Sequence, residues 1–274
     1  GYPMLNWKGK RPYTSTQYYP AQLKESYGDP DEKGWRNKVF WGDNLQVMSH
    51  LLKEYRGKVD LVYIDPPFDS KADYKKMISL KGKSVNNDHS MFEEIQYGDM
   101  WNNDDYLQFM YERLVLIREL LSEKGSLYVH CDGRKSHHLR MILDEIFGET
   151  NFRNEIRWKR QPVRGAKARA KQYAKNSDTI LFYSKSSIWT WNGAYKPYDE
   201  NFIKTKFRED ENGRLFRDCD LGDYSEDSIK KFEAENKIYI TSGGKKRLKR
   251  FLDEERGESL GDMWIDIPEL NSQA

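Results

Sequence analysis

The sequence has little of several features that define whole classes of proteins. Among its 274 residues there are two cysteines, Cys131 and Cys219, which form no CxxC pair and are too few for a disulfide framework. No apolar run approaches the roughly 20 residues of a membrane-spanning helix, and no signal peptide opens the chain. These absences predict a soluble, cytoplasmic protein that does not enter a membrane.

Neither sign of charge dominates the whole chain, but the basic residues are unevenly placed. Lys and Arg number 46 against 44 Asp and Glu, a net charge of +2. Between residues 153 and 175 there are nine basic residues and one acid, Glu155. Such an excess suits contacts with nucleic-acid phosphates, although a solvated flexible loop is the alternative. The residues assigned to DNA binding are Arg164, Lys167, Arg169, Lys171 and Lys175. A second basic cluster at 245–250 is a weaker candidate, because three acids follow it closely.

Short apolar segments separated by caps and turns predict alternating strands and helices. Strands are expected at 39–41, 58–64, 126–131, 154–159 and 178–183, and helices through 45–52, from 103 or 104 to 124, and through 139–147. This order is typical of an α/β domain with a parallel sheet and helices on its faces. Residues 1–37 are expected to form an irregular N-terminal arm, and residues 66–103 a long polar loop.

The stretch VDLVYIDPPF, residues 59–68, is the most informative in the chain. A short apolar strand ends at Asp65, and two prolines follow, which cannot continue a sheet. Open α/β sheets place their ligand crevices at such carboxyl ends of strands. The turn offers a carboxylate, backbone carbonyls and the ring of Phe68, which are the groups needed to hold a planar base by its exocyclic amine. An ordinary proline-rich turn is the alternative.

Five motifs together carry a resemblance to a known family. They are GDN at 42–44, DPPF at 65–68, GSLYVHCD at 125–132, NEIRWKR at 154–160 and DTILFYSKS at 178–186. The chain resembles a beta-class DNA amino-methyltransferase, most like adenine-specific enzymes that include modification subunits of type III restriction systems. The resemblance implies a Rossmann-like S-adenosylmethionine-dependent fold. Its core would be residues 38–187, with a small target-recognition lobe at 188–262 and a return to the core at 263–274.

The resemblance also implies a mechanism for the Asp65-Pro66-Pro67-Phe68 motif. The target base leaves the DNA stack, and Phe68 stacks on it. Asp65 and the Pro66 carbonyl accept hydrogen bonds from the amino group, which then takes the methyl group of S-adenosylmethionine by direct in-line displacement, without a metal. An Asp at the first position implies adenine N6, and cytosine N4 is the alternative target.

The cofactor-binding residues implied by the resemblance are Asp43, Asn44 and Asp65. Asp43 has an alternative role, because it is also a good N-cap for the helix that follows. Near Asp132, which remains ambiguous, lie three histidines whose spacing matches no metal site, and structural roles are expected for them. They are His130, His137 and His138.

One family element has no counterpart in this sequence. The family binds its cofactor with a glycine-rich FxGxG loop, and no GxG occurs among the 274 residues. We therefore expect an incomplete fold whose loop comes from a missing C-terminal segment or from a second polypeptide, so that this chain alone methylates nothing measurable. Expected partners are double-stranded DNA and a restriction subunit. The alternative function is a non-catalytic DNA-binding or specificity subunit.

Overall fold

The computed structural model describes residues 3–13, 17–67, 73–77, 93–98, 103–160, 171–173 and 175–268. It divides the chain into two compact units. The core unit comprises residues 1–190 and 262–274, and the lobe comprises residues 191–261. Each unit is described by itself.

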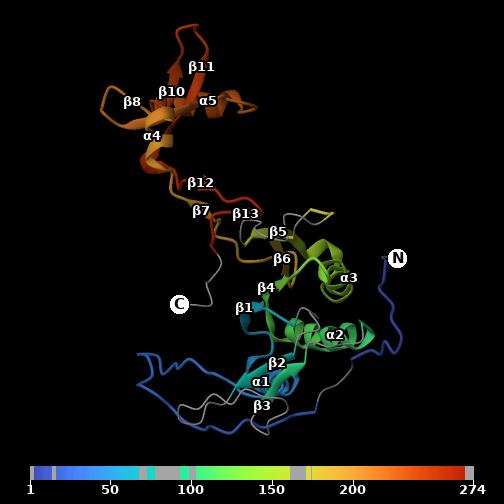
Figure 1. The fold of residues 1–274 in the computed structure, drawn as a ribbon. Coiled ribbons are helices and arrows are strands. Elements are labelled where there is room, and N and C mark those ends of the chain that lie inside the picture. Colours follow the sequence, from blue (N-terminus) through green and yellow to red (C-terminus); the bar gives the residue numbers. More distant parts are fainter. Residues whose placement is uncertain are drawn as a thin grey trace. The chain divides into compact units, whose positions relative to one another are not determined.

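The core unit is built on a five-stranded sheet in the order β1-β4-β6-β5-β13 (Figure 1). Its strands are β1 (Val59–Ile64), β4 (Leu121–Cys131), β5 (Phe152–Lys159), β6 (Ser177–Ser184) and β13 (Met263–Trp264). β1 runs parallel to β4 and β13 runs parallel to β5, whereas β6 is antiparallel to both of its neighbours. The predicted α/β class is confirmed, but the sheet is mixed rather than parallel throughout.

Three helices cover one face of this sheet, and the hydrophobic core lies beneath them. They are α1 (Asn44–Tyr55), α2 (Asn103–Leu120) and α3 (Ser136–Phe147), followed by a short 3-10 turn, η1 (Glu149–Asn151). Alternate residues of β4 and β6 point into the core and meet apolar residues spaced three or four apart on the helices. Buried members of this core are Leu107, Met110, Leu114, Leu127, Val129, Leu139, Ile142, Leu143, Leu181 and Tyr183. None of the helices in the described part of the chain is long and apolar enough to cross a membrane.

The first part of the expected N-terminal arm docks on these helices. Residues 3–13 form no helix or strand, but Trp7 is buried and its ring meets the edge of Tyr111 at 5.8 Å. Lys10 lies over the ring of Trp7 at 4.7 Å and forms a 2.7 Å ion pair with Glu145 of α3. The arm is therefore fixed to α2 and α3 by one aromatic and one charged anchor.

The strand predicted at 39–41 is absent, and that prediction is wrong. Val39 and Trp41 are almost fully exposed, at 97% and 94%. An apolar triplet becomes a strand only when another strand lies beside it, because its backbone groups need partners. Residues 39–41 belong to none of the described strands, and β1, the edge strand of this sheet, is bonded only to β4.

The region predicted as one long loop, residues 66–103, contains two strands. β2 (Asp73–Met77) and β3 (Glu93–Gly98) pair antiparallel as a separate two-stranded sheet. The sequence DYKKM of β2 has no apolar alternation, which is the pattern that marks a strand in a sequence. Its backbone pairing with β3, which these polar side chains permit, is what makes it a strand.

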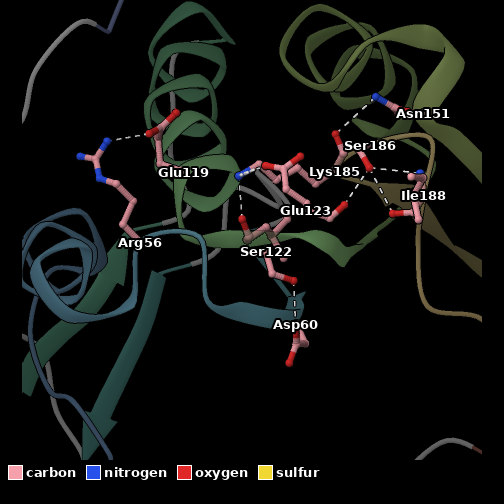
Figure 2. A network of polar contacts seen from close by, with 10 residues as sticks. Arg56, Asp60, Glu119, Ser122, Glu123, Asn151, Lys185, Ser186 and Ile188 are labelled. Carbon is pink, nitrogen blue, oxygen red and sulfur yellow. Dashed lines mark hydrogen bonds and ion pairs between the residues drawn. The ribbon is translucent and has the colours of Figure 1, made fainter.

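α2 ends four residues earlier than predicted, at Leu120, and Leu121 is instead the first residue of β4. The pairing with β1 jumps from Val59↔Leu121 to Leu61↔Ser126, so residues 122–125 bulge out of the ladder. Polar contacts occupy this end of the strand pair (Figure 2). Ser122 Oγ donates to Asp60 Oδ1 at 2.8 Å.

Residues that follow β6 hold the bulge from the other side (Figure 2). Lys185 Nζ donates to the Leu121 carbonyl at 2.7 Å and lies 3.4 Å from Glu123. Ser186 Oγ donates to the Glu123 carbonyl at 2.7 Å. A lysine at this place also suits the negative end of the α2 dipole. These contacts give hydrogen-bond partners to two carbonyls in the bulged part of β4, where the ladder with β1 is interrupted.

The lobe has a four-stranded antiparallel sheet in the order β10-β11-β9-β8 and a small aromatic core. Its elements are β7 (Tyr195–Lys196), α4 (Glu200–Lys206), β8 (Arg208–Glu209), β9 (Leu215–Cys219), α5 (Glu226–Ala234), β10 (Ile238–Ile240), β11 (Lys246–Phe251), η3 (Leu252–Glu254) and β12 (Glu258–Ser259). β12 pairs with β7, so the first and last segments of the lobe lie together. Its buried core residues are Phe207, Phe216, Leu248 and Phe251.

Gly125, in the bulge, provides a test of this packing. A Cβ there would lie 2.9 Å from the Val59 carbonyl oxygen and 3.0 Å from that of Ser122, both rigid backbone atoms. We expect Gly125→Ala to lower the free energy of unfolding by about 1–3 kcal/mol, measured by urea denaturation, because the strand pair must move apart. Gly133→Ala is the matched control, since a Cβ at that position meets nothing within 4 Å. Equal stability of the two variants would contradict the close approach.

Candidate active site

Asp65 lies at the carboxyl end of β1, where it meets a histidine from the neighbouring strand. The parallel register pairs Ile64 with Val129, so Asp65 and His130 follow side by side. His130 Nδ1 lies 3.1 Å from Asp65 Oδ1. The Asp65 side chain is 57% exposed, and the half-buried Pro66 and Pro67 lead the chain out of the sheet. Phe68 lies outside the described residues.

The second nitrogen of His130 faces another carboxylate. Its Nε2 lies 3.2 Å from Oδ2 of Asp178, which is 2% exposed at the start of β6. β6 runs antiparallel to β4 and pairs Ile180 with His130, which brings Asp178 to the same face. Arg160, just after β5, places its Nε 3.1 Å from the same carboxylate oxygen. The buried negative charge of Asp178 is therefore flanked by two cationic groups.

This geometry determines the protonation of His130. Both ring nitrogens face carboxylates, and only the doubly protonated imidazolium donates from both. Burial lowers the pKa of His130, but the hydrogen bonds to Asp178 and Asp65 outweigh it and raise the pKa to about 9. The neighbouring Tyr63 ring lies 6.5 Å away, and its pKa is raised by burial and then by Asp65 and Asp178. At neutral pH the cluster therefore holds a charged His130 and a neutral Tyr63.

The other reactive groups near this edge have structural surroundings. Burial raises the pKa of the Cys131 thiol to about 12, so it is no nucleophile at neutral pH. The rings of His137 and His138 lie 4.0 Å apart at the start of α3, and burial lowers the pKa of His138. Asp132 accepts from the backbone and side chain of Arg134 in the turn before α3. Within the described ranges, no three His, Cys, Asp or Glu side chains are grouped to hold a metal ion.

Asp43 and Asn44 form a second polar group, tied to α2. Asp43 Oδ1 accepts from the backbone N–H groups of Leu45 and Gln46, which confirms its predicted capping of α1. The buried Arg113 donates to Asp43 Oδ2 at 3.0 Å and to Asn44 Oδ1 at 2.5 Å. Burial lowers the pKa of Arg113, while Asp43 opposes that change. The two side chains are thus held in one orientation at the start of α1.

Only part of the predicted DNA-binding loop lies within the described residues. Lys171 and Lys175 are exposed, whereas Arg164, Lys167 and Arg169 lie outside the described residues. The weaker candidate cluster in the lobe is paired internally: Lys245 and Arg247 each lie 2.8 Å from Asp220, and Lys246 lies 2.5 Å from Glu233. The lobe as a whole has fifteen basic and sixteen acidic residues. Its basic cluster is therefore largely neutralised by its own acids.

Sequence reasoning missed the connection of His130, Asp178 and Arg160 to Asp65. The signal was available in the strand register, because the acids and the histidine follow apolar runs of similar length. Aligning YID of residues 63–65 with YVH of residues 128–130 as parallel neighbours places Asp65 beside His130.

The His130 cluster predicts a pH-dependent stability. The pKa of His130 rises from 6.5 to about 9 on folding, so its stabilisation is complete below pH 6.5 and is lost as the pH rises through 9. This difference corresponds to about 3 kcal/mol. We expect the free energy of unfolding of the wild type to fall by up to this amount between pH 6.5 and 9, relative to His130→Gln, in urea titrations at each pH. Parallel pH profiles for the two proteins would exclude a charged His130.

Comparison with known proteins identifies the family. A model of the N6/N4 DNA methylases, described as DNA methylase, matches residues 59–274. The type II methyltransferase M.EcaI of Enterobacter cloacae is 24% identical over 262 residues, covering 87% of this chain and 54% of that protein. The Mod subunit of the type III restriction-modification enzyme EcoPI, from Escherichia phage P1, is 27% identical over 270 residues, covering 88% and 41%. The chain thus spans about half or less of the length of these relatives.

Solved structures of DNA methyltransferases are also similar to parts of the chain. The crystal structure of an M1.HpyAVI–SAM complex is 15% identical, covers 60% of each chain and gives a TM-score of 0.37. The cytosine-N4-specific PvuII DNA methyltransferase is 16% identical, covers 54% of this chain and 49% of its own, and gives 0.33. The family assignment rests on the match over residues 59–274, which covers most of the sequence. This chain belongs to the N6/N4 DNA methylase family.

Proposed function

We propose that this chain forms the base-binding and DNA-recognition part of an adenine-N6 DNA methyltransferase. The observation that carries the proposal is the position of Asp65. It stands at the open end of β1 with one carboxylate oxygen facing His130, and its side chain remains more than half exposed. Two prolines then turn the chain away and free the Pro66 carbonyl from the sheet. An acceptor pair of this kind suits an exocyclic amino group.

In the proposed reaction, Asp65 and the Pro66 carbonyl accept hydrogen bonds from the amino group of an extruded base, and Phe68 stacks on its ring. These contacts raise electron density on the nitrogen and fix the direction of its lone pair. S-adenosylmethionine supplies the methyl group, so a C–N bond forms as the S–C bond breaks and the nitrogen then releases a proton. Catalysis comes from positioning and from exclusion of water.

The group around Asp43 fits a role in cofactor binding. Arg113 holds its carboxylate, the side chain is half exposed, and each carboxylate oxygen has the capacity to accept more than one hydrogen bond. Asp43 and Asn44 therefore have room to accept a donor such as the amino group of the adenine of S-adenosylmethionine. Asp65 lies at the end of the next strand along the chain and would face the methyl group.

The adenine target is supported by the Asp at the first position of the DPPF motif. Cytosine N4 is the second candidate, since the family includes both chemistries. Nucleoside analysis of methylated DNA distinguishes them, because N6-methyladenine and N4-methylcytosine separate chromatographically.

We propose further that the fold is completed by a segment or polypeptide carrying the glycine-rich cofactor loop. β1 is an edge strand among the described strands, and its Leu61 and Tyr63 are both largely exposed. Native proteins rarely leave a flat apolar edge open to solvent. Val39 and Trp41 are more exposed still, and they also lie in a segment without a neighbouring strand among the described residues. A strand added beside β1 would pair with its open backbone edge, and the segments connected to that strand would supply packing partners for these side chains.

In this proposal the lobe reads the DNA sequence and the segment 161–177 binds the DNA backbone. The near balance of charge in the lobe supports that division, because it leaves net attraction for phosphates to the core unit. A restriction subunit is the proposed partner, since the relatives include Mod subunits of type III restriction-modification enzymes.

The test of the central proposal is methyl transfer in a reconstituted enzyme. The purified chain is mixed with the segment that carries the glycine-rich loop, and transfer of labelled methyl groups to DNA is measured. We expect transfer with both parts and none with this chain alone. Asp65→Ala abolishes transfer and leaves DNA binding largely intact, because it removes the acceptor and no phosphate contact.

Asp60→Ala is the matched control, because this residue lies near the other end of the same strand and contacts Ser122. Strong methylation by the lone chain would refute the need for completion. Full activity of Asp65→Ala would refute the proposed role of Asp65, and DNA binding without any transfer would favour a specificity subunit.

A separate prediction concerns the basic segment. Replacing its five basic residues by glutamine should reduce the slope of log affinity for DNA against log salt by about 0.9 for each phosphate that the variant no longer neutralises. The variant replaces Arg164, Lys167, Arg169, Lys171 and Lys175. Fluorescence anisotropy at several salt concentrations measures the slope. The control is the double variant Lys245→Gln, Lys246→Gln in the lobe, which should leave the slope unchanged because both lysines already form ion pairs. A larger change of slope in the control than in the variant of the basic segment would show that the lobe makes the contacts with the DNA backbone.

A further inference from the structure

We propose that His130 is a positioning residue for methyl transfer, which holds one oxygen of Asp65 and leaves the other for the amino group of the target base. The inference rests on the proposed function of Asp65. It adds a residue that touches neither the base nor the cofactor in the proposed reaction and acts only through the Asp65 carboxylate.

The need for such a residue follows from where Asp65 lies. Its side chain is more than half exposed and stands between the last strand residue, Ile64, and two prolines that make no strand hydrogen bonds. An exposed carboxylate in this position turns freely about its side-chain torsions unless another group fixes it. In the part of the chain that is described, the polar group facing it is His130, 3.1 Å from Oδ1. Fixing one oxygen orients the second.

His130 suits this task because the imidazole is itself fixed on its other side. Nε2 lies 3.2 Å from the buried Asp178, and Arg160 lies 3.1 Å from the same Asp178 oxygen. The ring meets the edge of Trp158 at 5.8 Å and the ring of Tyr63 at 6.5 Å. A reactive group is held accurately when its supporting group is locked by packing and by further polar contacts.

The charges of the cluster alternate along this series of neighbouring groups. Asp65 and Asp178 are acidic, and His130 and Arg160 between and beside them are basic. A buried carboxylate such as Asp178 is tolerated only when cations or donors compensate it. The same imidazole therefore has two tasks, one at each nitrogen: it supports Asp178 through Nε2 and orients Asp65 through Nδ1.

Two substitutions separate these tasks. In His130→Asn the amide nitrogen takes the place of Nδ1, so Asp65 keeps its donor and Asp178 no longer has one from this residue. In His130→Gln the amide nitrogen takes the place of Nε2, so Asp178 keeps its donor and Asp65 does not. The two variants have the same charge and the same amide group, and they differ by one methylene, which decides which carboxylate keeps its partner.

We expect activity and stability to rank these variants in opposite orders in the reconstituted enzyme. His130→Gln should unfold at the higher denaturant concentration of the two, but should lower kcat by about 10-fold to 100-fold with little change in KM for DNA. His130→Asn should be less stable and keep kcat within a few-fold of the wild type. A purely structural histidine would give activity that follows stability, and that result would overturn the inference.

A second measurement does not depend on methyl transfer. The groups facing His130 are Asp65 and Tyr63 from β1, Asp178 from β6 and Arg160 after β5. Imidazole nitrogen chemical shifts of the chain alone should show a doubly protonated His130 at pH 7.5. Asp65→Asn and Asp178→Asn should each lower the pH at which it loses its proton. An unchanged titration in Asp65→Asn would overturn the inference.

The two measurements also separate this inference from the proposed function. If Asp65→Ala retains full methyl transfer, the proposed role of Asp65 fails, whatever the nitrogen shifts show. If Asp65→Ala is inactive while His130→Gln has the wild-type kcat, Asp65 is needed and the positioning role of His130 is refuted. If the reconstituted enzyme transfers no methyl groups, the proposed function fails and the Asp65→Asn titration alone decides whether the bridge exists.

Discussion

The parallel pairing of β1 with β4 is the constraint on which the site depends. A slip of one residue would turn every side chain of β1 to the opposite face and separate Asp65 from His130. The register is set at the far end of the strands, where residues 122–125 bulge and Gly125 permits the close approach to Val59. Lys185 and Ser186 hold that bulge through backbone carbonyls. Between the bulge and Asp65 the apolar pattern keeps this register, because Val62 and Ile64 pack in the same core as Leu127 and Val129.

The two faces of the sheet carry different kinds of side chain: one carries the apolar core, and the other carries the charged cluster around His130. One face packs against α1, α2 and α3 and contains nearly all of the fully buried apolar side chains of the core unit. The opposite face carries the His130 cluster, together with the stacked rings of Tyr128 and Phe182, 4.5 Å apart. Charged groups are expensive inside an apolar core, because their burial requires compensating partners. On the second face, Asp178 is buried beside two cationic side chains while Asp65 remains more than half exposed.

The sequence predicted those elements whose signals are local. β5, β6 and α3 lie close to where short apolar segments, apolar helical spacing and the terminating Gly148 placed them, because each pattern is contained in its own segment. The failures involve partners that a local pattern does not contain. Residues 39–41 form no strand because no described strand lies beside them, and β2 is a strand although its residues are mostly polar. α2 ends before its predicted last turn because Leu121 pairs with Val59 instead. The link between Asp65 and His130 was missed for the same reason, since it exists only in the register.

The distribution of charge constrains how the proposed recognition lobe works. Three of its arginines form ion pairs with acids of the lobe itself. Arg208 pairs with Asp218, Arg217 lies 2.9 Å from Glu255, and Arg214 lies 2.7 Å from Asp253. With fifteen basic and sixteen acidic residues, the lobe offers a polyanion such as DNA little net electrostatic attraction. Under the proposed function, the lobe then contributes hydrogen bonds and shape, which discriminate between sequences, while the basic segment of the core unit supplies the affinity common to all DNA. In that proposal, a lobe of this composition distinguishes sites without holding the enzyme on every sequence it meets.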